Sequence, residues 1–125
     1  MGRTLSIIKP DGVERNIIGK ILTKYEVAGF KIINISMITL SHEMAERHYF
    51  EHKDKSFYGE LIKYITSGPS VIVELEAEGA VPKLRAANDE IRELWGVSTT
   101  KNTVHGSDSD VSAMREIELF FGNRA

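Results

Sequence analysis

The spacing of the hydrophobic residues changes twice in the first 40 positions. Residues 4–8 form an apolar run, which predicts a short strand that ends in a turn at residues 9–12, Lys-Pro-Asp-Gly. Apolar residues then recur three and four apart over residues 18–25, so an amphipathic helix is expected there, with Gly29 as its natural end. Apolar and polar residues alternate over residues 30–40, which predicts a half-buried second strand. The alternating apolar residues of that strand are Ile33, Ile35 and Met37.

The middle of the chain predicts two helices and a third strand. Ser41 is a suitable N-cap for a helix that runs through His52, and a second short helix is expected over residues 58–65. Ser67-Gly68-Pro69 ends that helix, and the apolar run at residues 71–75 predicts the strand.

The last third is harder to interpret between Arg92 and Thr103. A helix is predicted from Gly79 to about Ala87. Pro82 does not contradict it, because proline is tolerated in the first turn of a helix. A short fourth strand is expected around residues 101–104, and Ser109 should open the final helix. The apolar residues of that helix that share one face are Val111, Met114, Ile117 and Phe121.

This order of elements predicts an α+β fold. Strands alternate with helices, but no glycine-rich phosphate loop follows the first strand. The order matches the split βαβ pattern of ferredoxin-like domains, βαββαβ, with a four-stranded antiparallel sheet covered by helices. Residues 1–125 are expected to form a single domain.

Composition and charge exclude several classes of function. The net charge of −2 gives no basic field for nucleic acid or a membrane surface, and no apolar run is long enough to span a bilayer. The absence of cysteine excludes disulfides, thiolate catalysis and cysteine-ligated zinc, and it suits a cytoplasmic protein.

Phosphate binding, if present, must come from side chains. The sequence has neither a P-loop nor a G-x-G-x-x-G string. Arginine and lysine pair well with phosphate oxygens, although each basic residue alone could equally be a solvated surface charge. The candidates are Lys9, Arg85, Arg92 and Lys101.

His105 is the candidate nucleophile. A neutral imidazole has a lone pair near pH 7, and a phosphorylated histidine is a high-energy carrier. Glu116 could hold the other ring nitrogen, while Ser107 and the first amides of the last helix could hold an anion nearby. The residues alone leave open the alternative that His105 is a loop histidine without a chemical role.

Other polar and aromatic residues favour structural interpretations. His48 and His52 share a helix face but lack the H-E-x-x-H pattern, so we interpret them as surface or partly buried residues rather than metal ligands. Phe57 and Tyr58 could stack on a base or belong to the core.

Several strings together resemble the nucleoside diphosphate kinase family, from about Thr4 to Phe121. The strings are Lys9-Pro10-Asp11, Tyr49, Phe57, Ser67-Gly68-Pro69, Arg85 and Asn102-x-x-His105-Gly106-Ser107-Asp108-Ser109. The resemblance implies a ping-pong reaction with low base specificity, in which a nucleoside triphosphate phosphorylates His105 and a nucleoside diphosphate then takes the phosphoryl group. It also implies Mg²⁺ as cofactor, held through the nucleotide phosphates and not by protein side chains.

The resemblance further assigns roles to individual residues. Lys9 and Asn102 would hold the sugar hydroxyls, Lys9 would reach the phosphates, and Tyr49 would sit beside the transferred phosphate. Arg85, and Arg92 in the place of a family arginine, would pair with phosphates. Phe57 would stack on the base, with Leu61 and Thr99 lining the same slot. Ser107 and Glu116 would support His105.

The chain departs from the family between Arg85 and Asn102, where its segment is shorter. The family's Thr-Asn-Pro string is absent, so its phosphate-contacting threonine has no counterpart here. In the family this segment packs subunits around a three-fold axis, so we expect a homodimer, or dimers paired into a tetramer, in preference to a hexamer. Two other functions stay open: a nucleotide-binding module without turnover, and a histidine phosphocarrier that serves a protein partner.

Overall fold

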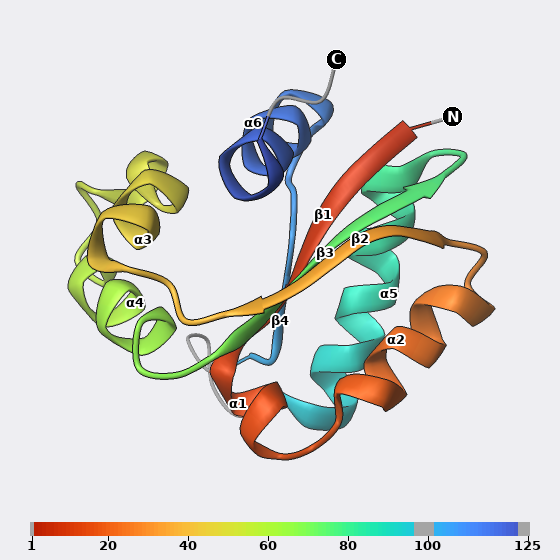
Figure 1. Ribbon diagram of the computed structural model, residues 1–125, viewed down its shortest axis with the longest axis horizontal. Helices are drawn as coiled ribbons and strands as arrows, with labels where there is room; N and C mark the ends of the chain where they lie inside the picture. Colours follow the sequence, from red (N-terminus) through yellow and green to blue (C-terminus); the bar gives the residue numbers. More distant parts are fainter. Residues whose placement is uncertain (1, 97–101, 123–125) are drawn as a thin grey trace.

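The computed structural model describes residues 2–96 and 102–122. Its sheet has four strands, β1 (Gly2–Ile8), β2 (Lys31–Ile38), β3 (Ser70–Ala77) and β4 (Val104–Gly106). They lie in the order β2-β3-β1-β4, and every neighbouring pair is antiparallel (Figure 1). This is the ferredoxin-like α+β arrangement, so the predicted fold class is confirmed.

Helices cover both faces of the sheet (Figure 1). They are α1 (Pro10–Glu14), α2 (Ile18–Val27), α3 (His42–His48), the 3₁₀ turn η1 (Phe50–His52), α4 (Tyr58–Ile65), α5 (Ala80–Trp95) and α6 (Asp110–Phe121). One hydrophobic cluster packs α2 and α5 against the sheet, and a second packs α3, α4 and α6 against its other face. None of the helices in the described ranges combines the length and apolar character that crossing a membrane would require.

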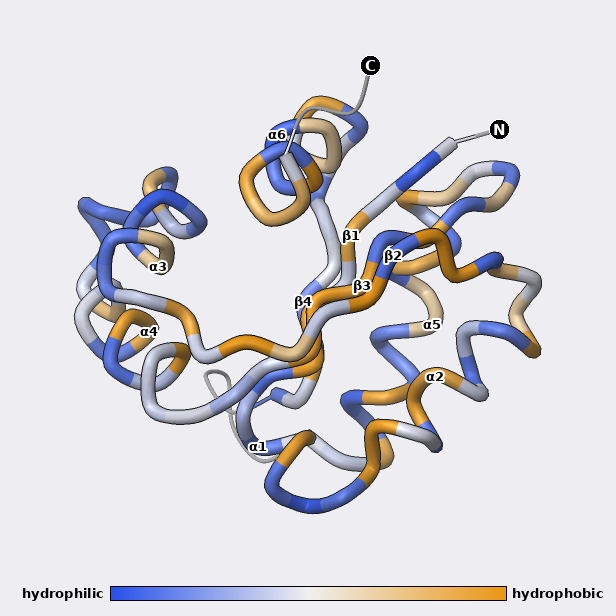
Figure 2. Tube along the Cα trace, viewed as in Figure 1, coloured by the Kyte–Doolittle hydropathy of each residue, from blue (hydrophilic) through white to orange (hydrophobic). Residues whose placement is uncertain are grey.

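The two central strands are buried on both faces, as the hydropathy of the chain trace also indicates (Figure 2). Leu5 and Ile7 of β1 join the cluster beneath α3, α4 and α6. Ser6 points to the opposite face, where its hydroxyl lies 2.7 Å from that of Tyr25. Each large apolar side chain buried in this way contributes roughly 1.5–3 kcal/mol to folding, so the sheet centre is the rigid base on which the ends of the strands are held.

The two predicted N-caps are confirmed. The Ser41 hydroxyl accepts a hydrogen bond from the Met44 amide at 3.1 Å, and that of Ser109 accepts one from the Ser112 amide at 3.1 Å. The second cap fixes the start of α6 and therefore the loop that follows His105.

Several predicted boundaries were wrong. The turn expected at residues 9–12 is the start of α1, because Pro10 occupies a first-turn position where its missing amide costs nothing. The helix expected to reach His52 ends at His48, and a 3₁₀ turn follows. The helix after Gly79 continues past Ala87 to Trp95, since neither glycine nor proline interrupts it before Gly96. The fourth strand lies at Val104–Gly106, later than predicted.

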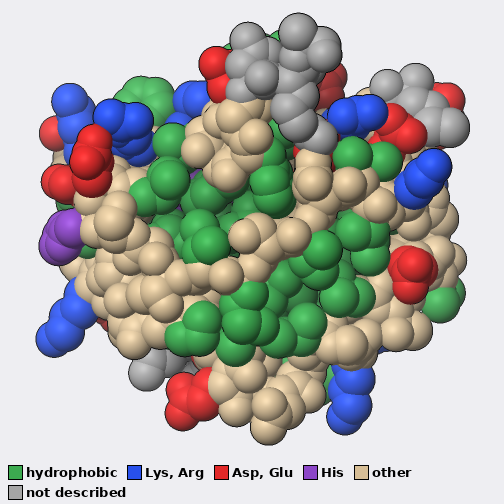
Figure 3. All heavy atoms as spheres, in the orientation of Figure 1, with side chains coloured by type: hydrophobic (Ala, Val, Ile, Leu, Met, Phe, Trp, Pro, Cys, Tyr) green, Lys and Arg blue, Asp and Glu red, His purple; other side chains and the backbone are tan. Residues whose placement is uncertain are grey.

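The predicted buried side of two elements was also wrong in part. In β2, the edge strand of the described sheet, Ile35 and Met37 are 51% and 57% exposed, and neither belongs to a hydrophobic cluster. Figure 3 shows hydrophobic side chains gathered in the middle of the face where β2 lies in Figure 1. In α6, Val111 and Met114 are exposed, Ile117 and Phe121 pack against the core as expected, and Glu116 is buried as well.

Candidate active site

A pocket of about 260 Å³ brings together most of the residues predicted from the sequence. Those that line it are Lys9, Tyr49, Phe57, Leu61, Arg92, Asn102, His105 and Glu116. Ser107 lies behind Glu116, Arg85 is not among the described lining residues, and Thr99 and Lys101 lie outside the described residues. A larger groove of about 1030 Å³ between α2 and α5 contains none of the predicted site residues, so we place the candidate site in the smaller pocket.

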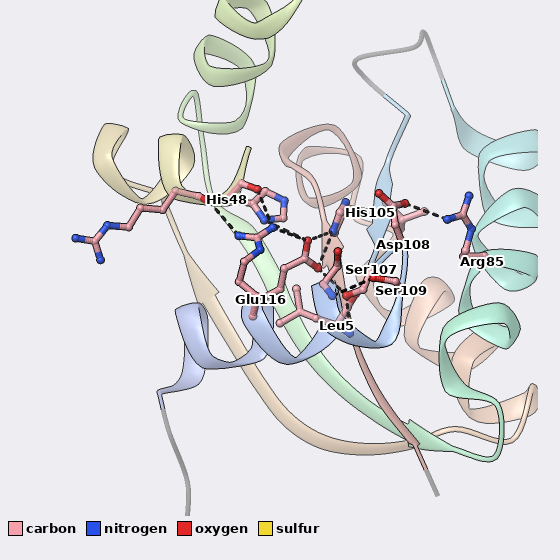
Figure 4. Close-up of polar contacts among 12 residues, drawn as sticks. Leu5, His48, Arg85, His105, Ser107, Asp108, Ser109 and Glu116 are labelled. Carbon is pink, nitrogen blue, oxygen red and sulfur yellow. Dashed lines mark hydrogen bonds and ion pairs between the residues drawn. The ribbon is translucent and has the colours of Figure 1, made fainter. Parts of the chain in front are cut away.

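Strand β4 holds His105 opposite Ile7 of the central strand β1. Its Nε2 atom lies 3.1 and 3.2 Å from the two carboxylate oxygens of Glu116 on α6 (Figure 4). The Ser107 hydroxyl donates to the same carboxylate at 2.6 Å, and the backbone amide of Ser107 donates to the Leu5 carbonyl at 3.2 Å. The imidazole is thus oriented by a carboxylate that is itself held in place.

Glu116 is ionised in this setting. Burial alone would raise the pKa of its carboxyl, but the hydrogen bond and charge of His105 and the hydrogen bond from Ser107 together lower it. An ionised carboxylate only accepts hydrogen bonds, so Nε2 of His105 must be the donor. The neutral ring then carries its lone pair on Nδ1, which is the nitrogen available to a substrate.

Lys9 and Asn102 form one wall of the pocket. The Lys9 ammonium donates to the side-chain oxygen of Asn102 at 2.8 Å, and the Lys9 amide donates to the Thr103 carbonyl at 2.7 Å. Lys9 is 5% exposed, and burial, with the nearby charge of Arg92, lowers its pKa to about 8. A buried ammonium joined to a neutral amide is well placed to receive an anion.

The two arginines differ in their surroundings. Arg92 on α5 lines the pocket and donates to the Val104 carbonyl at 2.8 Å. Arg85, two turns earlier, pairs with Asp108 at 3.0 Å, and the two side chains are 55% and 66% exposed. Asp108 is a lining residue, so Arg85 lies at the rim of the pocket rather than in its wall.

Strand β4 can approach α5 closely because residue 106 is glycine. A Cβ atom there would lie 2.8 Å from the side-chain nitrogen of Asn88 and 3.3 Å from Leu84. Gly106 is therefore required for packing against α5, in addition to any role in the loop.

The far side of the pocket is aromatic and apolar. Phe57, just before α4, exposes 43% of its surface and lines the pocket together with the buried Leu61. The buried Tyr49 has a pKa raised by desolvation and then by the charge of Glu116, so its hydroxyl stays protonated and can donate.

The sequence model of the family described as nucleoside diphosphate kinase matches residues 2–125. The chain belongs to the nucleoside diphosphate kinase family. The match covers both ends of the pocket, from Lys9 to Glu116.

Individual relatives agree with this assignment. The nucleoside diphosphate kinase of Clostridium perfringens is 48% identical over 129 residues, covering 95% of this chain and 90% of the relative. The nucleoside diphosphate kinase of Pelotomaculum thermopropionicum is 45% identical over 131 residues, covering 97% of this chain and 88% of the relative. This alignment is longer than the chain of 125 residues, so the relative carries residues that this chain lacks. The crystal structure of the Aquifex aeolicus nucleoside diphosphate kinase superimposes with a TM-score of 0.92 at 35% identity, covering 96% of this chain and 94% of that one.

Sequence reasoning missed several residues that line this pocket, among them His48, whose ring packs against that of His105. His48, predicted to be on the surface or partly buried, is buried, and its ring lies 4.6 Å from that of His105. Burial, and then the charge of His105, lowers the pKa of His48 well below its usual range. Ala45, His48 and Tyr49 stand three and four apart, and this helical spacing could have placed His48 on the buried face.

Proposed function

We propose that residues 1–125 act as one nucleoside diphosphate kinase domain that transfers the γ-phosphoryl group of a nucleoside triphosphate, typically ATP, to a nucleoside diphosphate through a phosphohistidine on His105. The observation that carries this proposal is the buried carboxylate that holds Nε2 of His105 and so leaves Nδ1 free at a pocket with basic walls.

In the first half-reaction, Nδ1 of His105 attacks the γ-phosphorus. The N–P bond forms as the bond from that phosphorus to the β–γ bridging oxygen breaks, and the nucleoside diphosphate leaves with the electron pair. The imidazole ring becomes cationic. Glu116, 3.1 Å from Nε2, stabilises that charge by accepting the hydrogen bond from Nε2–H, and the proton stays on Nε2. In the second half-reaction a β-phosphate oxygen of another diphosphate attacks the same phosphorus and the N–P bond breaks.

The rest of the pocket binds and orients the nucleotide. Lys9 and Asn102, joined at 2.8 Å, would bind sugar hydroxyls, with Lys9 also reaching the phosphates. Arg92 and Arg85 would pair with phosphate oxygens. Phe57 would stack on the base beside Leu61, and because stacking requires only a π-face, base specificity is low.

Mg²⁺ fits this site as an ion carried on the nucleotide. Mg²⁺ prefers oxygen ligands, whereas the one tight group of candidate ligands in the described chain, His48, His105 and Glu116, offers two nitrogens. When bound to the phosphates, the ion neutralises their charge and aligns them. Asp108 at the rim could accept hydrogen bonds from its water molecules.

We also propose a homodimer as the stable unit, able to pair into a tetramer, in preference to a hexamer. The exposed apolar side chains on the edge strand β2, Ile35 and Met37, support a contact between two copies of the chain. The low net charge and the cysteine-free sequence support a cytoplasmic enzyme whose partners are nucleotides, without nucleic acid or membrane.

One experiment tests the catalytic proposal. The protein is incubated with γ-labelled ATP and Mg²⁺, the acid-labile phosphoprotein is isolated, and unlabelled GDP is added. We expect label on the protein and then on GTP, and no label on His105→Ala. Label that stays on the protein would identify a phosphocarrier, absence of labelling would identify a binding module, and normal labelling of His105→Ala would refute the role of His105.

A further inference from the structure

His48 lies behind His105 in a position that phosphoryl transfer does not use. One ring nitrogen of His48, one of His105 and one oxygen of Glu116 all lie within 4.8 Å of one another. Within this group, Nε2 of His105 is 3.1 Å from one Glu116 oxygen, and Nδ1 of His48 is 3.8 Å from the other (Figure 4). All three residues line the pocket, so a small solute can reach them.

Neither ring nitrogen of His48 has a hydrogen-bond partner, although the side chain is buried. A buried polar atom without a partner costs free energy, and most such atoms in proteins are satisfied. An imidazole binds metals through the lone pair of one ring nitrogen, and both ring nitrogens of His48 lie at the pocket without a hydrogen-bond partner. The geometry therefore offers an unused ligand at the base of the active site.

Two imidazole nitrogens and one carboxylate oxygen are the ligand set of a zinc-class ion. Imidazole suits Zn²⁺ and its neighbours in the first transition series, whereas Mg²⁺ requires oxygen. Ligand atoms in a tetrahedral zinc site are about 3.4 Å apart. The Oε2 atom of Glu116 lies 3.2 Å from Nε2 of His105 and 3.8 Å from Nδ1 of His48, and no two of the three ligand atoms need be more than 4.8 Å apart, so the side chains must close together by about 1 Å to share an ion. The Ser107 hydroxyl, 2.6 Å from Glu116, already holds the carboxylate, as supporting hydrogen bonds do in metal sites.

We propose that His48, His105 and Glu116 bind a zinc-class divalent cation, with water from the pocket as fourth ligand, and that this ion and phosphorylation of His105 exclude each other. To bind the ion, His105 must give it the lone pair of Nε2, so the ring proton moves from Nε2 to Nδ1. Nδ1 then has no lone pair for the γ-phosphorus. The nearby cations Arg115, 3.6 Å from Glu116, and Lys9 limit the affinity. The inhibitory part rests on the proposed function, whereas binding of the ion does not.

Metal binding is measured first, without nucleotide. The unphosphorylated protein is titrated calorimetrically with ZnCl₂ in millimolar MgCl₂. We expect one zinc ion per chain, a loss of affinity of about tenfold or more in His48→Gln, and unchanged affinity in His42→Gln, an exposed histidine on the same helix. Equal affinity of His48→Gln and the unchanged protein, or no saturable binding below millimolar zinc, would overturn the site.

A second variant covers the case in which His48→Gln does not fold. His105→Asn, at a partly exposed position, should also lose the ion, with circular dichroism as the check on folding. Co²⁺ in the unchanged protein should give the strong visible absorption of a four-coordinate ion, and excess Zn²⁺ should remove it. A hydrated-ion spectrum would contradict the ligand set.

Single-turnover phosphorylation then tests the exclusion. With Mg²⁺-ATP in excess and free zinc buffered at ten times its dissociation constant, the phosphoenzyme should form about tenfold more slowly, by mass action. His42→Gln should be slowed equally. An unchanged rate with zinc bound would overturn the exclusion and leave the site intact. Absence of phosphoenzyme without zinc would refute the proposed function and leave the binding result unaffected.

Discussion

The two halves of the pocket are built in opposite ways. Around His105 the neighbouring groups are buried and closely held: Glu116 of α6 and Ser107, just after β4, lie within 2.6–3.2 Å of their hydrogen-bond partners. At the α5 rim, Arg85 and Asp108 pair in solvent, where an ion pair contributes only about 0–1 kcal/mol. Buried groups hold one geometry, whereas a weak exposed pair can exchange its carboxylate for a phosphate. In the proposed reaction, this difference separates the part that reacts from the part that receives the substrate.

Glu116→Gln changes the buried half of the pocket and should reduce activity more than any other substitution in this comparison. The amide can still accept from Ser107, but it no longer stabilises the cationic ring, so kcat should fall about 100-fold while KM changes little. Steady-state kinetics with ATP and a second diphosphate measure both constants. Glu118→Gln, an exposed position on the same helix, is the matched control. A rise in KM at constant kcat would assign Glu116 to substrate binding.

Lys9 lines the same pocket and should make nucleotide binding depend on pH. Its pKa of about 8 means that the ammonium is charged below pH 8 and neutral above it. Because kcat/KM reports the free enzyme, it should be high below pH 8 and fall above it, by about tenfold at pH 9. A pH profile of kcat/KM measures this limb. In Lys9→Gln, kcat/KM should be lower at every pH and should not fall above pH 8. The same fall in that variant would assign the titration to another group.

The two arginines test the exposed half. Arg92→Ala removes a cation from the pocket wall and should raise the KM for ATP about tenfold with a smaller change in kcat. Arg85→Ala removes a guanidinium that must break its pairing with Asp108 before it can bind phosphate, so the KM for ATP should rise less in this variant. Equal effects would mean that Arg85 contacts phosphate as closely as Arg92 does, and no effect of Arg92→Ala would make it structural through its bond to Val104.

Asp108→Asn is expected to have the smallest effect, in the opposite direction. It releases Arg85 from its partner and removes a negative charge from the pocket lining, so the KM for ATP should fall about threefold, consistent with a surface pair. The difference from the unchanged enzyme should shrink at high salt, because exposed charges are screened. A higher KM would show that Asp108 positions Arg85 for the phosphates.

The sequence predicted the positions of the helices and strands better than it predicted which of their faces is buried. Alternating and helical spacings located the sheet strands and the main helices, since a period is visible in one dimension. They did not fully identify which side of β2 or α6 is buried, because that depends on neighbours distant in the chain: Ile35 and Met37 join neither hydrophobic cluster, and Glu116 turns inward to meet His105.

The same limit applies to the site. The string around His105 identified the nucleophile candidate, and the structure brings Lys9 and Asn102 together although 93 residues separate them. The helical spacing could have placed His48 on a buried face, but not beside His105, because that neighbour comes from another element. The rim position of Arg85 was also not predictable, since it depends on the α5 to β4 distance that Gly106 permits.

The three-residue strand β4 has a consequence for biosynthesis. It pairs only with β1 in the described sheet, and the Ile7 and His105 partners lie at nearly opposite ends of the chain. While a ribosome is still making the chain, β1 and β3 can associate, but the free edge of β1 stays open until the last stretch emerges. Closing so long a loop is slow compared with local contacts. A nascent chain therefore acquires its sheet before it acquires catalytic competence, and chains released early would expose an unpaired strand edge.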